Sequence, residues 1–237
     1  MAAVAVLFAF GCGGGGDPLT GRAPAGPTVA VELDARPTHS IVATALAGEI
    51  TARADPSPGA EPVAVLRHPT ERGAPLVFQV LRIEGDRAEV LLPVRPNGTS
   101  GWVRLDQVAL AENPYRIEIV TGDHVLRLWR EGRLELEAPV AIGTGATPTP
   151  IGDFYLTELV RPPDPAGPYG THAYGLSGYS ETLSEFNGGD GVIGLHGTND
   201  PSSLGGDVSH GCVRLANDTI DRLAAVLPLG TPVVISA

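Results

Sequence analysis

The clearest pattern in the chain is the alternation of apolar and polar side chains between residues 115 and 136. Residues 115–120, 126–128 and 134–136 each alternate in this way, and short glycine-containing turns separate them. Successive side chains of a strand point to opposite faces, so a period of two indicates half-buried antiparallel strands. This part of the chain is therefore predicted to be a β-meander.

Three further elements are predicted in the C-terminal part of the chain. The apolar run 192–195 predicts a buried strand, and residues 231–235 predict the last strand. Apolar residues at helical spacing across 220–227 predict a helix, which either Asn217 or Asp218 caps. The expected fold class is mainly β, with one or two short helices.

The region before the meander contains short β-type runs separated by turn residues. These runs are residues 41–44, 63–66, 76–81, 88–92 and 101–103. They predict a small β-barrel-like module over residues 38–111. Its closing segment, residues 101–104, resembles the last strand of small Src-homology-3-like barrels. A generic β module that only packs against its neighbour is an equal alternative.

The N-terminal segment predicts export rather than a folded domain. Residues 1–12 form a short apolar run ending in Cys12, which resembles a bacterial lipoprotein signal cleaved before the cysteine. No basic residues precede the run, so an uncleaved or ordinary signal and a cytosolic protein remain alternatives, and the true start codon stays open. Residues 13–37 are rich in Gly, Pro, Ala and Thr and predict a flexible linker. Lipidation is expected on Cys12.

Composition excludes several kinds of partner. The chain of 237 residues has 16 basic and 27 acidic residues, which gives a formal net charge of −11. Nucleic-acid binding depends on basic surface, so no nucleic-acid partner is expected. No segment has the run of about 20 apolar residues that a membrane span needs. A lipid on Cys12 is therefore the expected contact with a membrane.

Cys212 is the main candidate for chemistry. Apart from Cys12 it is the only cysteine in the chain. A cysteine is nucleophilic as a thiolate, and a nearby imidazole or cation lowers its pKa. His196 follows the predicted strand 192–195, which would hold it rigidly as the base, and Arg214 supplies a cation. We expect Cys212 and His196 to form a thiolate–imidazolium pair, with a neutral pair as the alternative.

Several alternatives compete with this assignment. Cys212 could be a small buried hydrophobe, although polar residues precede it. His210 could be the base in place of His196. His196, His210 and Cys212 could together bind zinc, but the chain lacks the paired spacing of common zinc sites, so no metal and no cofactor is expected. Arg214 could be a solvated surface residue.

The segments around Cys212 carry a resemblance to a known family. Leu195-His196-Gly197-Thr198, followed by Ser209-His210-Gly211-Cys212-Val213-Arg214-Leu215, resembles the signature of the L,D-transpeptidases, bacterial cell-wall enzymes with a YkuD-type catalytic domain. Residues 143–154 resemble the proline-threonine turn that leads into a core strand of that domain. The resemblance implies a YkuD-type, β-sandwich-like catalytic domain over residues 112–237.

The resemblance also implies roles for individual residues. Cys212 would be the nucleophile, and His196 would be the proton donor and acceptor. The backbone carbonyl of Gly197 would orient His196. The backbone amide of Gly211, with that of Cys212, would stabilise the oxyanion. Substrate contacts are expected from five residues: Arg214, His210, Ser209, Thr198 and His172.

The implied activity is transfer within peptidoglycan stem peptides. Cys212 would attack an L-to-D peptide bond, and the acyl group would pass to a side-chain amine of a neighbouring stem. Hydrolysis instead would make the protein an L,D-carboxypeptidase, and a catalytically inactive wall-binding protein is an alternative of another class. The resemblance further implies roles in cell-wall organisation and cell shape, and acylation by carbapenems. We expect an exported monomer in the cell envelope, lipid-anchored at the outer face of the cytoplasmic membrane.

Overall fold

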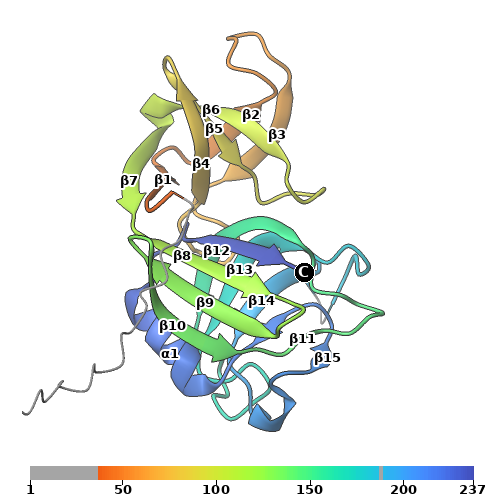
Figure 1. Ribbon diagram of the computed structural model, residues 1–237. Coiled ribbons are helices and arrows are strands. Elements are labelled where there is room, and N and C mark those ends of the chain that lie inside the picture. The colour runs from red at the N-terminus through yellow and green to blue at the C-terminus, as the bar shows by residue number, and fades with distance from the viewer. Residues whose placement is uncertain (1–36, 187–188) are drawn as a thin grey trace, which may run out of the picture. The chain divides into compact units, whose positions relative to one another are not determined.

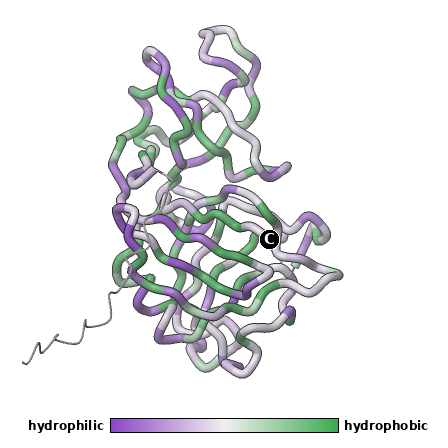
Figure 2. Tube along the Cα trace, in the orientation of Figure 1, coloured by the Kyte–Doolittle hydropathy of each residue, from purple (hydrophilic) through white to green (hydrophobic). Residues whose placement is uncertain are grey.

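The computed structural model describes residues 37–186 and 189–237 of the chain. Within these residues the regular structure is mostly β, and the one α-helix is α1 (Asn217–Val226), as Figure 1 shows. Two short 3-10 helices, Leu105–Gln107 and Pro201–Ser203, complete it. Hydrophobic and hydrophilic residues alternate along strands in Figure 2, as expected for sheets with one buried face. The predicted mainly β fold is confirmed.

The first part of the described chain forms a seven-stranded sheet. Its strands are β1 (Ser40–Ala45), β2 (Glu49–Arg53), β3 (Pro62–Arg67), β4 (Val77–Glu84), β5 (Arg87–Leu91), β6 (Ser100–Arg104) and β7 (Val108–Asn113). Their spatial order is β3-β2-β6-β5-β4-β1-β7. The short runs in the sequence correspond to β1, β3, β4, β5 and β6, whereas the sequence pattern does not indicate β2 and β7.

The second sheet has eight strands and contains the candidate chemistry. Its strands are β8 (Tyr115–Val120), β9 (Val125–Arg130), β10 (Arg133–Pro139), β12 (Gly152–Val160), β13 (Ala173–Tyr179), β14 (Val192–His196), β16 (Val213–Arg214) and β17 (Pro232–Ser236). Their order is β10-β9-β8-β17-β12-β13-β14-β16. A separate parallel pair consists of β11 (Ile142–Gly143) and β15 (Asp207–Ser209).

The predicted meander and final strand are both present in this sheet. Strands β8, β9 and β10 pair antiparallel in sequence order, and Ile117 and Ile119 of β8 are fully buried. The last strand, β17, lies between β8 and β12 and is parallel to β8. The C-terminal segment is therefore part of the middle of the sheet, where it completes the core.

The predicted helix is present as α1, but its predicted cap is wrong. Ile220 and Leu223 of α1 are fully buried against the core of the second sheet. The N-cap residue is Ala216, which makes no side-chain cap hydrogen bond, so neither Asn217 nor Asp218 has that role. The first turn of the helix is instead used by the candidate active site.

The two sheets belong to the same compact unit of the chain. A small buried cluster contains side chains from both: Val42, Val77, Leu91 and Tyr155. Asn113, the last residue of β7, also donates its side-chain N–H to Thr231 Oγ1 at 3.0 Å. These contacts fix the first sheet against the sheet that carries Cys212.

A loop of the first sheet also holds part of the connection between β13 and β14. The guanidinium of Arg95 donates to three backbone carbonyl groups: those of Ser180 at 2.6 Å and of Leu183 and Asp190 at 3.0 Å each. Charged donors to carbonyls make strong hydrogen bonds. Arg95 therefore positions residues that follow β13 and precede β14.

Candidate active site

Strand pairing brings the two main candidate residues together. β14 pairs in parallel with β16, and Leu195 lies opposite Val213. Cys212 therefore lies directly beside the C-terminal half of β14. A Cβ built on Gly194 would lie 3.6 Å from His196 Cδ2 and 3.7 Å from Cys212 Sγ. Because Gly194 has no side chain, the thiol and the imidazole share one open space.

The imidazole of His196 is fixed in orientation and tautomer. The residue is only 4% exposed, and its Nδ1 lies 2.6 Å from the carbonyl oxygen of Gly197. A carbonyl oxygen only accepts hydrogen bonds, so Nδ1 carries the proton and Nε2 is the unprotonated nitrogen. The ring of Tyr169 packs against the imidazole with 4.9 Å between ring centroids. Nε2 is thus the atom that can take a proton.

Burial keeps both candidate residues uncharged near neutral pH. It lowers the pKa of His196 from 6.5 to about 4; the Gly197 hydrogen bond opposes this shift, and the Arg214 cation adds to it. Burial also raises the pKa of Cys212 above its ordinary value of 9.0. The Gly194 N–H, 3.3 Å from Sγ, and the Arg214 cation both lower this pKa, but the effect of burial is larger. The buried site thus disfavours both charges of the predicted thiolate–imidazolium pair and favours the neutral pair, its alternative.

Ser209 shapes the turn that carries Cys212. Its Oγ accepts the N–H of Gly211 at 3.0 Å and donates to the carbonyl oxygen of Cys212 at 2.5 Å. Ser209 is only 2% exposed. The hydroxyl predicted to contact substrate therefore lies inside the protein. The turn also requires glycine at position 211, where φ is 117°.

The two amides predicted to stabilise an oxyanion differ in their hydrogen bonding. The Gly211 N–H is already donated to Ser209 Oγ. The Cys212 N–H donates to no backbone acceptor in the part of the chain that the structure describes. The Cys212 amide is therefore available to a substrate oxygen, whereas the Gly211 amide would first have to leave Ser209.

The proline-threonine segment supports the same turn. Thr149 Oγ1 donates to the carbonyl oxygen of Gly211 at 2.9 Å and accepts the N–H of Gly143 at 2.9 Å. Thr149 is buried. The segment leads into β12, as the sequence predicts, and it also fixes the backbone directly before Cys212.

Two of the predicted substrate residues lie in different surroundings. His210 is exposed, and its ring stacks on Phe186 with 5.0 Å between centroids. Phe186 lines the same cavity as Cys212, so His210 lies at the edge of that cavity. Thr198 is buried, and its Oγ1 accepts the N–H of Asp200 at 3.1 Å. Thr198 therefore stabilises a loop and does not present its hydroxyl to the cavity.

His172 supports the loop that follows β14. Its Nδ1 lies 2.7 Å from Asp221 Oδ1 of α1. Its backbone carbonyl accepts the N–H of Gly197 at 3.1 Å. Since Gly197 provides the carbonyl that holds His196, His172 acts on the site through this loop.

Arg214 places a positive charge close to both reactive groups. Its backbone pairs with Ala141 through hydrogen bonds of 2.8 and 3.0 Å. The charge lowers the pKa of both His196 and Cys212. Its Nε is buried and has no hydrogen-bond partner among the described residues. Arg214 is not among the residues that line the cavity of Cys212 and His196, so it acts on them through its charge.

Two further residues shape the site, and the sequence pattern does not indicate their roles. Asn217 Oδ1 accepts the N–H of Thr198 at 3.1 Å, and a Cβ built on Gly170 or Gly197 would collide with it. Asn217 therefore holds the loop after His196 in place. Tyr169, whose ring packs on the imidazole of His196, is the second, and no motif in the sequence marks it.

The cavity shared by Cys212 and His196 has a volume of about 350 Å³. Its walls include apolar groups of Val160, Tyr169 and Ile193. Small-molecule and peptide sites are typically clefts of about 300–1,000 Å³ with mainly apolar walls and a few polar groups. The cavity can therefore hold the reacting part of a peptide.

Neither a metal site nor a membrane-spanning helix is found in the described residues. In residues 37–186 and 189–237, no group of three or more His, Cys, Asp or Glu side chains could hold a metal ion. No helix in the same ranges is long and apolar enough to cross a membrane. Cys12, the predicted lipidation site, and all but the last residue of the predicted linker 13–37 lie outside the described residues.

Comparison with known proteins identifies the family. The model of the L,D-transpeptidase catalytic domain, YkuD, matches residues 114–235. The chain therefore belongs to the L,D-transpeptidase family. The match covers the second sheet, with β14, the Cys212 turn and α1, and it starts after the first sheet.

Two sequence relatives carry the name of this family. A Bacillus licheniformis protein named L,D-transpeptidase YkuD is 37% identical over 155 residues, which cover 62% of this chain and 86% of that protein. A Bacillus subtilis protein of the same name is 39% identical over 123 residues, which cover 52% of this chain and 66% of that protein. The solved structure of Bdellovibrio bacteriovorus Bd1075 is 31% identical, with a TM-score of 0.40 over 51% of this chain and 47% of that one. This chain thus spans about half the length of the solved chain.

Proposed function

We propose that the protein is a cysteine acyltransferase that forms peptidoglycan cross-links or attaches amines through an acyl-enzyme on Cys212. L,D-transpeptidases act on peptidoglycan stem peptides, and the chain belongs to that family. The observation that carries the proposal is the space beside Gly194, where Cys212 Sγ and the His196 ring lie together. The hydrogen bond from His196 Nδ1 to the Gly197 carbonyl leaves Nε2 ready to accept a proton.

In the first step the neutral thiol of Cys212 attacks the carbonyl carbon of an L-to-D peptide bond. The S–C bond forms while the thiol proton passes to His196 Nε2. The oxyanion is stabilised by the Cys212 N–H. The C–N bond then breaks, and His196 returns the proton to the departing amine. Because the thiol loses its proton only during attack, the buried site never has to hold a thiolate at rest.

In the second step an amine attacks the thioester. Its N–C bond forms and the C–S bond breaks, while a proton passes from the amine to His196 and then to Cys212 Sγ. This restores the neutral pair. If water replaces the amine, the product is a shortened stem peptide and the enzyme is an L,D-carboxypeptidase. The apolar groups of Val160 and Ile193 in the wall of the cavity favour exclusion of water and hence transfer.

Arg214 is proposed to bind an anionic group of the donor stem. Its charge acts on both Cys212 and His196, so it attracts an anionic group that enters the site beside them. A carboxylate there would partly neutralise the cation. His210, at the edge of the cavity, is proposed as a second substrate contact.

The place of action proposed is the cell envelope. The apolar run before Cys12 and the Gly- and Pro-rich segment 13–37 support an exported monomer held by a lipid on Cys12. A tether of this kind would let the catalytic sheet reach stem peptides at a distance from the membrane. Mass analysis of the N-terminal peptide from cells would test this, because a diacylated Cys12 is expected there.

Incubation of the purified protein with muropeptides tests the proposed activity. Cross-linked dimers or amine-exchanged stems are expected, and the mass of each product identifies the acceptor. Shortened stems alone would indicate a carboxypeptidase, and unchanged muropeptides would indicate a wall-binding protein. One carbapenem per chain is also expected to bind covalently to Cys212, and the variant Cys212→Ser should prevent this.

A further inference from the structure

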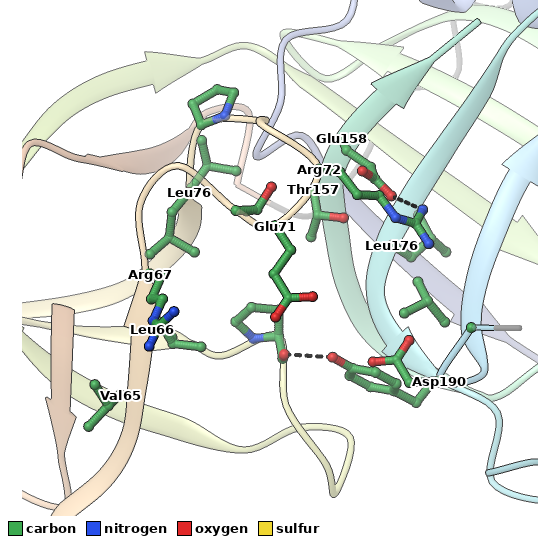
Figure 3. A pocket seen from close by; sticks show the side chains of 17 residues that line it. Val65, Leu66, Arg67, Glu71, Arg72, Leu76, Thr157, Glu158, Leu176 and Asp190 are labelled. Carbon is green, nitrogen blue, oxygen red and sulfur yellow. Dashed lines mark hydrogen bonds and ion pairs between the residues drawn. The ribbon is translucent and has the colours of Figure 1, made fainter. Parts of the chain in front are cut away.

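A second and larger cavity continues from the candidate active site. Its volume is about 680 Å³, and Figure 3 shows it from close by. One wall contains residues 65–67 of β3 and residues 70–72 and 75–77 after it, and the other contains residues from β12, β13 and the start of β14. Five residues line both cavities: Arg72, Glu158, Gly189, Asp190 and Val192. The two cavities are therefore continuous.

Both signs of charge occur in the second cavity, with more carboxylates than guanidinium groups. Arg72 and Glu158 form an ion pair of 2.8 Å where the two cavities meet. Figure 3 shows the carboxylate of Glu71 pointing into the cavity, with Asp190 on the facing wall. Among the described residues, no ion pair occupies the carboxylates of Glu71 and Asp190. They can therefore bind a cationic group that enters the cavity.

We propose that this second cavity binds the acceptor of the transfer reaction, a peptide end with a free primary ammonium beside a carboxylate. The inference rests on the proposed function, which requires an amine near Cys212. Glu71 and Asp190 bind the ammonium group, and the guanidinium of Arg67 binds the carboxylate. The first sheet, which lies outside the family match, thereby becomes part of the substrate site.

The position of Asp190 connects binding with the reaction. Asp190 lines both cavities, whereas Glu71 lines only the second. An ammonium held by both carboxylates therefore lies on the route to the thioester. The bound ammonium first releases one proton to solvent, which gives the free amine that attacks. A second proton passes from the nitrogen to His196 Nε2 as the N–C bond forms and the C–S bond breaks, and then to Cys212 Sγ. Carboxylates of this kind select an amine over water by raising its local concentration.

Direct binding to an inert enzyme tests the proposal. The variant Cys212→Ala is titrated by calorimetry with a stem tripeptide that ends in diaminopimelic acid, and with the same peptide acetylated on its side-chain amine. Glu71→Gln and Asp190→Asn are each expected to raise the Kd of the free peptide about threefold, and together about tenfold, as for exposed charge pairs. The acetylated peptide should bind the Cys212→Ala protein as weakly as the free peptide binds the double variant. Its Kd should not rise further when Glu71 or Asp190 is replaced.

The matched control is Glu84→Gln, on an exposed carboxylate at the end of β4 outside both cavities. It should leave the Kd of both peptides unchanged, and melting curves should show that all variants are folded. An absence of binding, an unchanged Kd in the double variant, or an equal loss for free and acetylated peptides would each overturn the proposal.

Failure of the proposed function would give a different result. In that case the protein with intact Cys212 would leave muropeptides unchanged, while the Cys212→Ala variant would still bind the free peptide through Glu71 and Asp190. If the protein converts muropeptides but Glu71→Gln leaves the Kd of the free peptide unchanged, the transferase activity stands and the acceptor site is rejected.

Discussion

At the scale of single residues, the uncharged state of Cys212 and His196 determines how pH affects the enzyme. The pKa of His196 is lowered to about 4 by burial, and that of Cys212 is raised above 9.0. The base works only when it is neutral, so kcat/KM should fall as the pH drops through about 4. A histidine with its ordinary pKa of 6.5 would already lose activity in mildly acidic buffer. The pH profile of kcat/KM measures this directly.

Alkylation of Cys212 by iodoacetamide tests whether the thiol is protonated at neutral pH. The rate should stay low through neutral pH and rise only in alkaline buffer, because the thiol is protonated below its raised pKa. His196→Ala should give nearly the same profile. Rapid alkylation of the wild type at mildly acidic pH, lost in His196→Ala, would instead reveal an ion pair.

The roles proposed for Cys212, His196 and His210 predict how much activity each substitution removes. Cys212→Ala should abolish turnover, since no other described residue of the turn can form a thioester. His196→Ala should lower kcat/KM by about 10²–10⁴, the usual range for a general base. His210→Ala should cost less than about tenfold, because His210 lies at the cavity edge and stacks on Phe186. A larger loss for His210→Ala than for His196→Ala would exchange their roles.

Asn217 offers a prediction about a residue that positions His196. Removing its side chain in Asn217→Ala leaves the Thr198 N–H, 3.1 Å from Oδ1, without its acceptor. An unsatisfied buried donor costs about 1–3 kcal/mol, so the melting temperature should fall. The Gly197 carbonyl should also lose its fixed orientation, and kcat should fall more than KM changes. Asp218→Ala, on the exposed neighbour, is the control, and Asn217→Asp should restore part of both losses because it keeps an acceptor oxygen.

At the scale of elements, the sequence predicts β8, whose burial is one-sided, and misses β13, which is covered on both faces. β8 alternates because one of its faces is buried, as Ile117 and Ile119 show. β13 has the burial pattern of a strand covered on both faces and contains two glycines. Gly178 of β13 lies against the ring of Phe154, where a Cβ would collide with it. Such a strand lacks a period of two, so its pattern resembles a loop.

The sequence likewise predicts only part of the candidate site. The chemistry of Cys212 and His196 follows from their types and from strand 192–195, which the structure shows as β14. Their charge states depend on burial by residues that are distant in the sequence, and no local pattern records this. The inward turn of Ser209 likewise depends on its bonds to Gly211 and Cys212, which form only in the folded turn.

β12 carries a further prediction, about stability. Tyr155 is fully buried between the sheets, and its hydroxyl has no hydrogen-bond partner among the described residues. Burying an unpaired hydroxyl costs about 1–3 kcal/mol. Tyr155→Phe keeps the ring and removes the unpaired group, so the free energy of unfolding should stay equal or rise. Denaturant unfolding measures it, and a clear loss of stability would show that the hydroxyl has a partner in solution.

At the scale of the whole molecule, a loop of the first sheet holds part of the second sheet, which carries Cys212 and His196. Asn97 Nδ2 donates to the carbonyl of Tyr179 at 2.8 Å, and the N–H of Tyr179 donates to Asn97 Oδ1 at 2.9 Å. Arg95 binds three further carbonyls of the same connection, between β13 and β14. The loop between β5 and β6 therefore holds a wall of both cavities, and the first sheet should be needed for full activity.

The last prediction tests this coupling with Arg95→Ala. Loss of three charge-assisted hydrogen bonds, at 2.6 to 3.0 Å, should free the backbone around Ser180 and Asp190. Hydrogen–deuterium exchange should become faster in residues 180–186 and 189–191, and kcat/KM should fall although Arg95 lies outside the Cys212 cavity. Arg82→Ala is the matched control, because it removes an exposed ion pair within the first sheet, Arg82 with Glu89 at 2.7 Å, worth at most about 1 kcal/mol. Equal exchange rates in both variants would show that the catalytic sheet holds this connection without the first sheet.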